Sequence, residues 1–186
     1  MPRRTTTDTV HQLEVTLDDV EPPVWRRIEV PSSITLAALH GVIQQAMGWQ
    51  DYHLHHFEIG ETVYGVDDGE GWGPPIVDEK RTRLGDVAPE GTVFSYQYDF
   101  GDSWEHGIKV EQVAAPAGGA SYPRCVAGER ACPPEDCGGA WGYSELLDAL
   151  ADPRHERHEE LLEWVGGSFD PAEFHLEDVN ARLRRA

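Results

Sequence analysis

Two stretches in the middle of the chain alternate apolar and polar residues, and this alternation constrains the fold more than any other feature. The apolar positions are Phe94, Tyr96, Tyr98 and Phe100 in the first stretch and Trp104, His106, Ile108 and Val110 in the second. Successive side chains of a strand point to opposite faces of a sheet, so this pattern is typical of strands with one buried face. The sequence therefore predicts a long hairpin in a sheet that is covered on one side.

The connection between these two strands decides which residues face each other. A two-residue turn would mix the two apolar faces, whereas a loop of residues 101–103 places both apolar sets on one side. This second register sets Phe100 opposite Trp104 and Tyr98 opposite His106. We therefore predict the longer loop, with the His106 side chain directed into the core.

The same register brings two carboxylates together on the outer face. Asp99 and Glu105 would oppose each other, and opposed like charges are unfavourable unless a cation lies between them. Arg26 or Arg27 could supply that cation. In the alternative interpretation, Asp99 and Asp102 serve only turn chemistry and an ion pair at the strand edge.

The chain before this hairpin predicts further strands and one helix. The expected strands are 13–17, 24–30 and two short segments within 54–64 that are joined through Gly60. Between them, residues 36–47 carry apolar side chains at helical spacing. Thr35 or Ser33 is the expected N-cap of this helix, and Gly48 is its expected stop.

These elements predict an α+β fold. The sheet is expected to be mixed and β-grasp-like, in the order ββαββ plus the long hairpin, and to be followed by a helical C-terminal part. Helix start signals in that part are Ser144, Asp152 with Pro153, and Asp170 with Pro171 and Glu173. We expect a single domain over residues 10–186, made of a body (10–112), a loop (113–142) and C-terminal helices (143–186).

The segment 113–142 is rich in glycine and proline and shows no periodicity, which favours a loop that is functional or tied down. It holds all three cysteines of the chain, Cys125, Cys132 and Cys137. Zinc held by these thiols together with His155 or His158 is one interpretation, although the paired spacing of structural zinc sites is missing. Burial of the thiols as small apolar side chains is the other.

Charge and composition limit the classes of partner. The chain has 34 acidic and 15 basic side chains, a formal net charge of -19, so it should repel phosphate backbones and anionic membranes. We therefore expect no direct nucleic-acid binding. The N-terminal arginines are not followed by an apolar run, so we expect no signal peptide and no membrane span. The odd cysteine count favours a reducing compartment, and we predict a cytoplasmic protein.

Histidines near residue 55 are the first candidates for chemistry. In the stretch HLHHFEI, His53 and His55 share a face with Phe57, whereas His56 faces the other way. His55 and His106 are thus both expected to point inward, and they would converge if their strands were neighbours. Such a pair could bind a metal, for which zinc is our candidate. The alternative is that both are hydrogen-bonded structural residues.

Two tryptophans lie in glycine-rich surroundings. Trp72 lies within DDGEGWGPP and Trp141 follows CGGA. Either could line a groove for a ligand or peptide, or could simply pack a loop against the body.

Several motifs occur together in one order from Leu13 to Leu183. They include PPVWRRIEVPSSITLAALHGVIQQAMGW, HLHHFEIG, YDFGDSWEHGIKVE, YPRCVAGERACPPEDCGG, GYSELLDALADPRHERHEELLEW and FDPAEFHLEDVN. In these motifs the chain resembles the plasmid pRiA4b Orf-three-like family, some of whose members are passengers of insertion elements labelled TnpR. The resemblance implies an α+β fold with a helical C-terminal part and an association with plasmids or mobile elements. His175 departs from the aspartate that this resemblance leads us to expect as the cap of the last helix.

The resemblance does not imply recombination. The chain lacks the nucleophilic serine with an arginine cluster, and the basic helix-turn-helix, that a serine recombinase needs. A role as a DNA-associated partner in transposition has local support only in Arg26, Arg27 and the C-terminal RLRR, and the net charge opposes it.

We therefore predict an accessory or interaction domain of unknown specific role, with a polar pocket between the sheet and the CPPEDCGG loop. Its partner would be an unidentified protein or small molecule. The predicted lining residues are His55, Asp99, Asp102, Trp104, His106, Glu135 and Asp136.

The alternative is a metal-dependent hydrolase acting on phosphate esters. In that case His55 and His106 are metal ligands, Asp99 or Asp102 is a further ligand, and Glu105 or Glu135 is the general base. The sequence does not decide whether the protein is an enzyme.

Overall fold

The computed structural model describes residues 9–66 and 75–185, and Trp72 lies outside these residues. The strands are β1 (Val10–Leu17), β2 (Trp25–Pro31), β3 (His55–Ile59), β4 (Thr62–Gly65), β5 (Ile76–Asp78), β6 (Val93–Tyr98), β7 (Trp104–Ala114) and β8 (Arg124–Glu129). The helices are α1 (Leu36–Met47), α2 (Leu84–Val87), α3 (Gly139–Ala151), α4 (His158–Trp164) and α5 (Leu176–Leu183). The predicted α+β class is confirmed.

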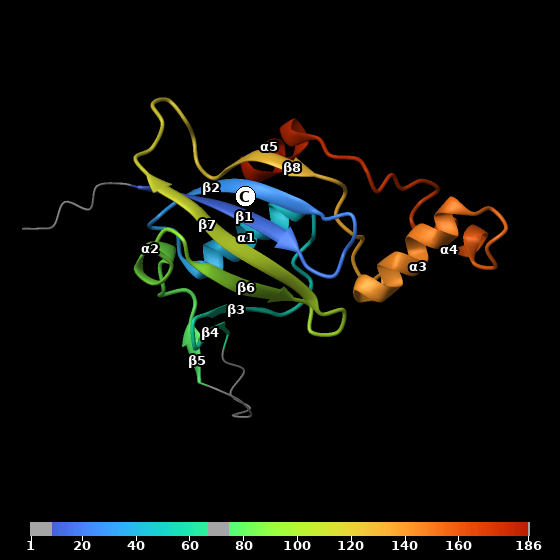
Figure 1. Cartoon of the computed structure of the whole chain (residues 1–186), viewed down its shortest axis with the longest axis horizontal. Coiled ribbons are helices and arrows are strands. Elements are labelled where there is room, and N and C mark those ends of the chain that lie inside the picture. Colours follow the sequence, from blue (N-terminus) through green and yellow to red (C-terminus); the bar gives the residue numbers. More distant parts are fainter. Residues whose placement is uncertain (1–8, 67–74, 186) are drawn as a thin grey trace, which may run out of the picture.

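The strands form a mixed sheet in the order β5-β4-β3-β6-β7-β1-β2-β8 (Figure 1). Neighbouring strands are antiparallel except β4 and β5, which are parallel. The predicted first hairpin, helix and second hairpin thus appear in the expected order. The later hairpin of β6 and β7 lies between them in the sheet.

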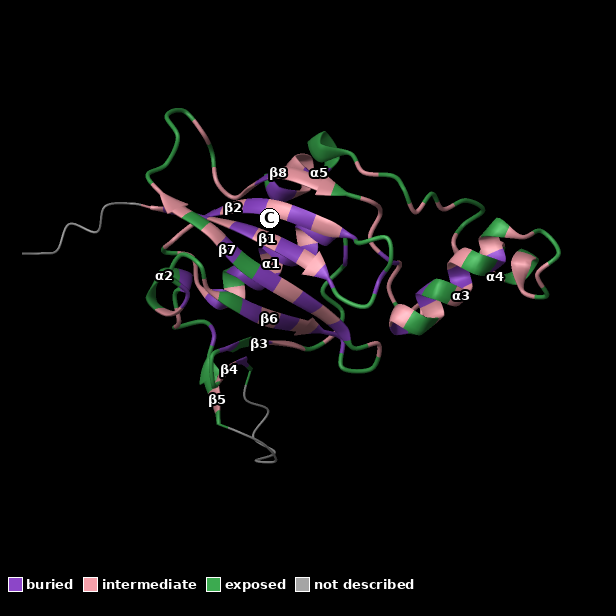
Figure 2. Ribbon diagram, in the orientation of Figure 1, coloured by how far each residue is buried: buried purple, intermediate pink, exposed green. Residues whose placement is uncertain are grey.

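One face of the sheet is covered and the other faces solvent. Figure 2 shows buried and less buried residues alternating along β1, where Leu13, Val15 and Leu17 point into the core. Helix α1 covers this face, and α5 packs on α1 and β8 (Figure 1). The period of two that the sequence shows is therefore the result of one-sided burial.

Helix α1 has the predicted ends. Thr35 is the N-cap, and its hydroxyl oxygen accepts a hydrogen bond from the Ala38 N–H at 3.2 Å. Gly48 ends the helix at φ 104°, a left-handed conformation that favours glycine. The buried face of α1 also carries two polar residues, His40 and Gln44, so this helix delivers polar groups to the interior.

The β6–β7 hairpin has a different register from the predicted one. Tyr98 lies opposite Trp104 and Tyr96 lies opposite His106, so the loop covers residues 99–103. The reason is a compact turn in which Asp99 has φ 58° and accepts the Gly101 N–H on its Oδ1 at 2.9 Å. Because the register differs by an even number of residues, the side chains within β6 and β7 keep their predicted faces. The prediction for Phe100 is wrong, because this residue lies in the turn and is 50% exposed.

The predicted contact between Asp99 and Glu105 is consequently wrong. Gln97 lies opposite Glu105, and Asp99 lies beyond the end of β6. Neither arginine acts there. Arg26 is buried and donates hydrogen bonds to the carbonyl oxygens of residues 46, 129 and 130, and Arg27 pairs with Glu14 and Glu111 on the solvent face.

The expected loop 113–142 contains an additional strand. Strand β8 pairs with β2 at the edge of the sheet, and α3 begins before the segment ends. A Cβ atom on Gly128 would approach the Phe174 ring to 2.7 Å and the Trp25 carbonyl oxygen to 2.9 Å, so only glycine fits there. Strand β8 was not predicted, because the glycine and proline residues of this segment are typical of a loop. Its pairing with β2 and its packing on Phe174 come from tertiary contacts.

The C-terminal helices begin at other residues than their start signals suggest. Helix α3 begins at Gly139, before Ser144, and Asp152 ends α3 instead of opening the next helix. His175 occupies the N-cap position of α5 without a side-chain cap hydrogen bond. Helices α3 and α4 lie to one side of the sheet, beyond the β6–β7 turn (Figure 1). None of the helices within the described ranges is long and apolar enough to cross a membrane.

Candidate functional site

Two groups of histidine and carboxylate side chains lie near each other at one end of the sheet. The inner group consists of His40, Asp51, His55 and Glu79, and the outer group of His53, Asp99 and Asp136. In His40, Asp51 and His55, and likewise in the outer group, the potential ligand atoms lie within 4.8 Å of one another. Tyr98 lies between the groups, with its ring centroid 6.4 Å from that of His40 and 5.9 Å from that of His53.

The inner group is built on two stacked imidazole rings. His40 comes from α1 and His55 from β3, and their ring centroids lie 3.4 Å apart at an interplanar angle of 4°. The Nε2 atom of His40 lies 2.8 Å from Asp51 Oδ1, and the Nε2 atom of His55 lies 2.9 Å from Glu79 Oε2. Each ring therefore has a carboxylate partner of its own.

Further hydrogen bonds close the inner group. The His40 Nδ1 atom lies 2.8 Å from the Tyr96 hydroxyl, which also accepts a hydrogen bond from the Gln44 amide. The Asp51 backbone N–H donates to the side-chain oxygen of Gln44. Burial, and then the neighbouring His55, lower the pKa of His40, so its ring is neutral at neutral pH.

Parallel stacking is poor geometry for binding one metal ion. An imidazole nitrogen binds a metal through a lone pair that lies in the plane of the ring, at about 2.0 to 2.1 Å for zinc. The His40 and His55 planes are nearly parallel and about one ring thickness apart, so no point lies in both planes. We therefore interpret the inner group as a hydrogen-bond network that is largely buried, with the Asp51 side chain at its exposed end.

The outer group is arranged differently. His53 precedes β3, Asp99 follows β6, and Asp136 lies between β8 and α3. The His53 Nε2 atom lies 2.9 Å from Asp136 Oδ1 and 3.6 Å from Asp99 Oδ2. This nitrogen is buried yet has no hydrogen-bond partner, because the short distance to Asp136 does not have hydrogen-bond geometry. The two carboxylates lie near the nitrogen without a hydrogen bond to it.

These separations suit ligands of one small cation. Two ligand atoms at about 2.1 Å from a tetrahedral ion lie about 3.4 Å apart. The two distances from His53 Nε2, 2.9 and 3.6 Å, bracket that value. The side chain of Asp99 is nearly buried, whereas that of Asp136 is 64% exposed, so the group opens to solvent on the Asp136 side.

The backbone at the carboxylates is unusual. Asp51, Asp99 and Asp136 have φ angles of 57°, 58° and 56°, in the left-handed region that only a few per cent of non-glycine residues adopt. Such conformations cost free energy and persist where the surrounding structure holds them. At Asp99, the Gly101 N–H binds Oδ1 and leaves Oδ2 directed to the side of His53.

The loop that carries Asp136 is held against the end of the sheet. The Glu135 carboxylate accepts hydrogen bonds from the Gln50 N–H at 2.8 Å and from the Tyr98 hydroxyl at 3.1 Å. The Asp102 carboxylate accepts the Gly138 N–H at 3.1 Å. Four of the predicted pocket residues are thus brought to one place, namely Asp99, Asp102, Glu135 and Asp136.

The other predicted pocket residues lie elsewhere. Trp104 and His106 are buried on β7, and His55 belongs to the inner group. The His106 Nδ1–H donates to the carbonyl oxygens of Tyr96 and Trp104, and burial lowers the pKa of His106 to about 4. Strand β6 separates the strands of His55 and His106, so the structure does not bring these rings together as a ligand pair.

The cysteines are free thiols. Burial raises the pKa of Cys137 to about 12, and it also raises the pKa values of Cys125 and Cys132. Within residues 9–66 and 75–185, neither these thiols nor His155 or His158 belong to a group that could hold a metal.

The predicted general bases have other surroundings. Glu135 accepts hydrogen bonds from the Tyr98 hydroxyl and the Gln50 N–H. Glu105 lies on the solvent-facing side of β7 but is partly buried there, and this burial raises its pKa. Neither carboxylate belongs to the inner or the outer group.

Sequence reasoning missed several residues of both groups, namely His40, Asp51, His53 and Glu79. His53 has the same strand parity as His55, and that signal could have identified it. His40 follows Leu36 by four residues on the buried stripe of α1, which is a weaker signal. No local pattern marks Asp51 or Glu79, because their roles depend on contacts between distant segments.

Comparison with known proteins identifies relatives without an assigned function. A family profile described as plasmid pRiA4b ORF-3-like protein matches residues 9–178. An uncharacterized protein named y4hQ from Sinorhizobium fredii is 47% identical over 174 residues, covering 92% of this chain and 89% of that protein. The crystal structure of a protein of unknown function, MM3350 from Methanosarcina mazei Go1, is similar with a TM-score of 0.86 and 38% identity, covering 93% of this chain and 98% of that one.

Proposed function

This chain belongs to the plasmid pRiA4b ORF-3-like protein family, and we propose that it is an accessory protein that binds one divalent metal ion through His53, Asp99 and Asp136. The observation that carries the proposal is the His53 Nε2 atom, which is buried between two carboxylates without a hydrogen-bond partner. A buried polar atom without a partner is rare and calls for a ligand, an ion or a water.

Charge supports a cation as that ligand. Asp99 is only 7% exposed, and a buried carboxylate is costly unless a positive group balances it. Asp136 adds a second carboxylate at the same place. A metal ion would neutralise both carboxylates.

The ligand types restrict the choice of metal. One imidazole nitrogen and two carboxylate oxygens suit Zn²⁺ or Mn²⁺, because Ca²⁺ prefers a larger set of oxygen ligands and Cu⁺ prefers sulfur. Three protein ligands leave room for further ligands. A donor atom of a small molecule or of a partner protein would bind there, on the solvent side of Asp136.

Ligation would also connect separate parts of the fold. The three side chains come from the segment before β3, the end of β6 and the loop before α3. A metal bound by all three would fasten that loop to the sheet, and α3 and α4 with it. We therefore propose a structural or docking role for the ion.

Hydrolysis is not part of the proposal. None of the relatives found has an assigned activity, so the metal-dependent hydrolase considered from the sequence is not supported. The geometry also does not supply the ligand pair of His55 and His106 on which that alternative rested.

Metal binding can be tested by titrating the chelator-treated protein with Zn²⁺ and Mn²⁺ in a calorimeter and by elemental analysis. We expect one ion per chain, and an affinity about 30-fold lower in His53→Ala, which corresponds to about 2 kcal/mol. His56→Ala is the matched control, because His56 lies three residues further along the chain, faces the other way and pairs with Glu58.

Two outcomes would contradict the proposal. One is the absence of stoichiometric binding of either ion to the wild-type protein. The other is binding that survives His53→Ala and Asp99→Asn but is lost on replacing Cys132 with serine, which would place the ion at the cysteines.

A further inference from the structure

Helix α4 differs from the neighbouring helix α3 in how far its apolar residues are buried. It carries Leu161, Leu162 and Trp164, yet none of its residues is buried, and Trp164 is 46% exposed. Helix α3, beside it, buries Tyr143, Leu146 and Ala149. A helix with apolar residues and no buried side chain is typical of a surface that a partner covers.

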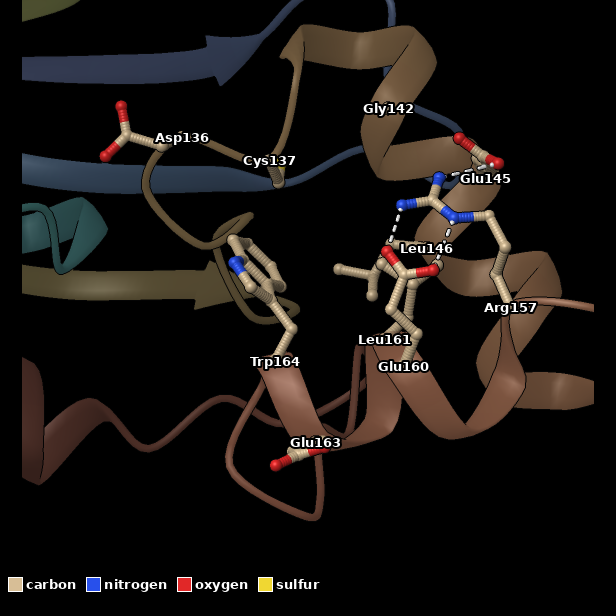
Figure 3. Close-up of a pocket in the computed structure, with 10 residues that line it drawn as sticks. All are labelled: Asp136, Cys137, Gly142, Glu145, Leu146, Arg157, Glu160, Leu161, Glu163 and Trp164. Carbon is tan, nitrogen blue, oxygen red and sulfur yellow. Dashed lines mark hydrogen bonds and ion pairs between the residues drawn. The ribbon is translucent and has the colours of Figure 1, made fainter.

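The surface of α4 forms one wall of a cavity of about 450 Å³. Leu146 of α3 and Leu161 of α4 supply apolar lining, and the Trp164 indole extends toward the loop with Asp136 and Cys137 (Figure 3). The volume lies within the range of ligand sites, about 300 to 1,000 Å³. It has room for a few side chains of another molecule.

The charged residues around this cavity are mainly acidic. Four carboxylates line it, from Asp136, Glu145, Glu160 and Glu163, against one guanidinium. That group, Arg157, lies 2.9 Å from Glu145 and 2.7 Å from Glu160, so it is already paired (Figure 3). Asp136 and Glu163 are the other two carboxylates of the lining, and in Figure 3 the Glu163 side chain points away from the Trp164 indole.

We propose that this cavity is a docking site for a basic, partly apolar segment of another protein. A lysine or arginine side chain would lie over the Trp164 indole, where a cation–π contact and the acidic lining of the cavity favour it. An apolar side chain of the same segment would pack on Leu161, which is partly exposed. This inference goes beyond metal binding and shares only Asp136 with it.

Charge complementarity decides between the conceivable occupants. The chain carries a formal net charge of -19, so a nucleic acid or an anionic membrane would be repelled. A second copy of the chain would bring the same negative charge to an acidic rim. A positively charged segment gains from both the local rim and the field of the whole protein.

The test uses a short synthetic amphipathic peptide of lysine and leucine, titrated into the full-length protein by calorimetry at low and at physiological ionic strength. We expect binding that weakens with salt, and about tenfold weaker binding to Trp164→Ala. Trp164→Phe should retain most of the affinity, because an aromatic face remains. Glu163→Gln should weaken binding about threefold.

The matched control is Trp141→Ala. Trp141 is 79% exposed on α3 and does not line the cavity, so its removal should leave the affinity unchanged. Circular dichroism melting of the variants verifies folding, and Trp164→Ala should be tolerated because Trp164 is 46% exposed.

Three results would overturn the proposal. Equal peptide affinity of the wild type and Trp164→Ala would mean that the peptide binds the acidic surface in general and not the cavity beside Trp164. Comparable binding of a glutamate and leucine peptide would remove the charge argument. A concentration-dependent dimer that Trp164→Ala dissociates would identify a second copy as the occupant.

Failure of this proposal is distinguishable from failure of the metal proposal. Peptide binding is measured with the chelator-treated protein and with His53→Ala, and both should bind like the wild type. If they do while the wild type binds no metal, the docking site stands and the metal site is wrong.

Discussion

The inner and the outer group contain the same kinds of residue but differ in how their nitrogens are directed. In the inner group both Nε2 atoms have carboxylate partners and the rings are parallel. In the outer group the His53 Nε2 atom lies between two carboxylates but has no hydrogen-bond partner. Proximity of histidine and aspartate is thus shared by a hydrogen-bond network and by a candidate metal site, and the stacking of the rings and the hydrogen-bond partners of the nitrogens separate them.

The largest expected effect is a loss of protein stability when the inner group is disrupted. His40→Ala removes a stacked ring and its hydrogen bonds to Asp51 and Tyr96, and it leaves a cavity. We expect the free energy of unfolding to fall by about 3 to 4 kcal/mol in urea denaturation. Zinc affinity of the folded variant should stay within about twofold of wild type. A variant that lost metal binding and kept its stability would show that the roles of the two groups are reversed.

The stability of the protein should depend on pH through His106, because burial lowers the pKa of this side chain. Its pKa is about 4 in the folded protein, below the ordinary value of 6.5, so the unfolded state binds more protons between these values. The stability contribution is complete above pH 6.5 and is lost as the pH falls toward 4. The loss is about 3 kcal/mol at 1.36 kcal/mol per pKa unit.

This pH effect is measured by urea denaturation of wild type and His106→Gln across the pH range. The variant should show a shallower slope of unfolding free energy against pH, whatever its absolute stability. An unchanged slope would assign the pH dependence to other groups. His40 of the inner group would then be the next residue to substitute, because burial also lowers its pKa.

Metal addition should stabilise the protein through the outer group. Zn²⁺ at about 100 times its dissociation constant is expected to raise the free energy of unfolding by about 2.7 kcal/mol. The gain should fall to about 0.9 kcal/mol in His53→Ala, because the affinity of this variant is about 30-fold lower, and it should persist in full in His40→Ala, as followed by thermal melting with and without the ion. A gain that vanishes only in His40→Ala would move the metal site to the inner group.

The smallest effect concerns the loop that delivers Asp136. Asp102→Ala removes the acceptor of the Gly138 N–H at the start of α3. We expect a loss of about 1 kcal/mol in stability, as for a helix cap, and metal affinity lowered by about threefold. Asp148→Ala on α3 serves as the control. If metal affinity is unchanged in Asp102→Ala, the position of Asp136 does not depend on this contact.

Much of the fold could be predicted because its signals are local. The alternation in β6 and β7, the caps of α1 at Thr35 and Gly48, and the turn at Gly60 each depend on a few neighbouring residues. Strand β8 could not be predicted in this way, because its pairing with β2 and its contact with Phe174 involve distant segments. The pocket prediction was partly local too, since Asp99 and Asp102 lie in one turn.

By itself the sequence determined which side of each strand is buried, since side-chain direction follows the period of the backbone. It also determined the acidic surface and the family. Only the tertiary structure decided the register of the 99–103 turn and the meeting of His53, Asp99 and Asp136, which come from three separate segments. The physical reason is that contacts between distant segments depend on how the elements pack, and no local pattern of residues encodes the direction of a lone pair.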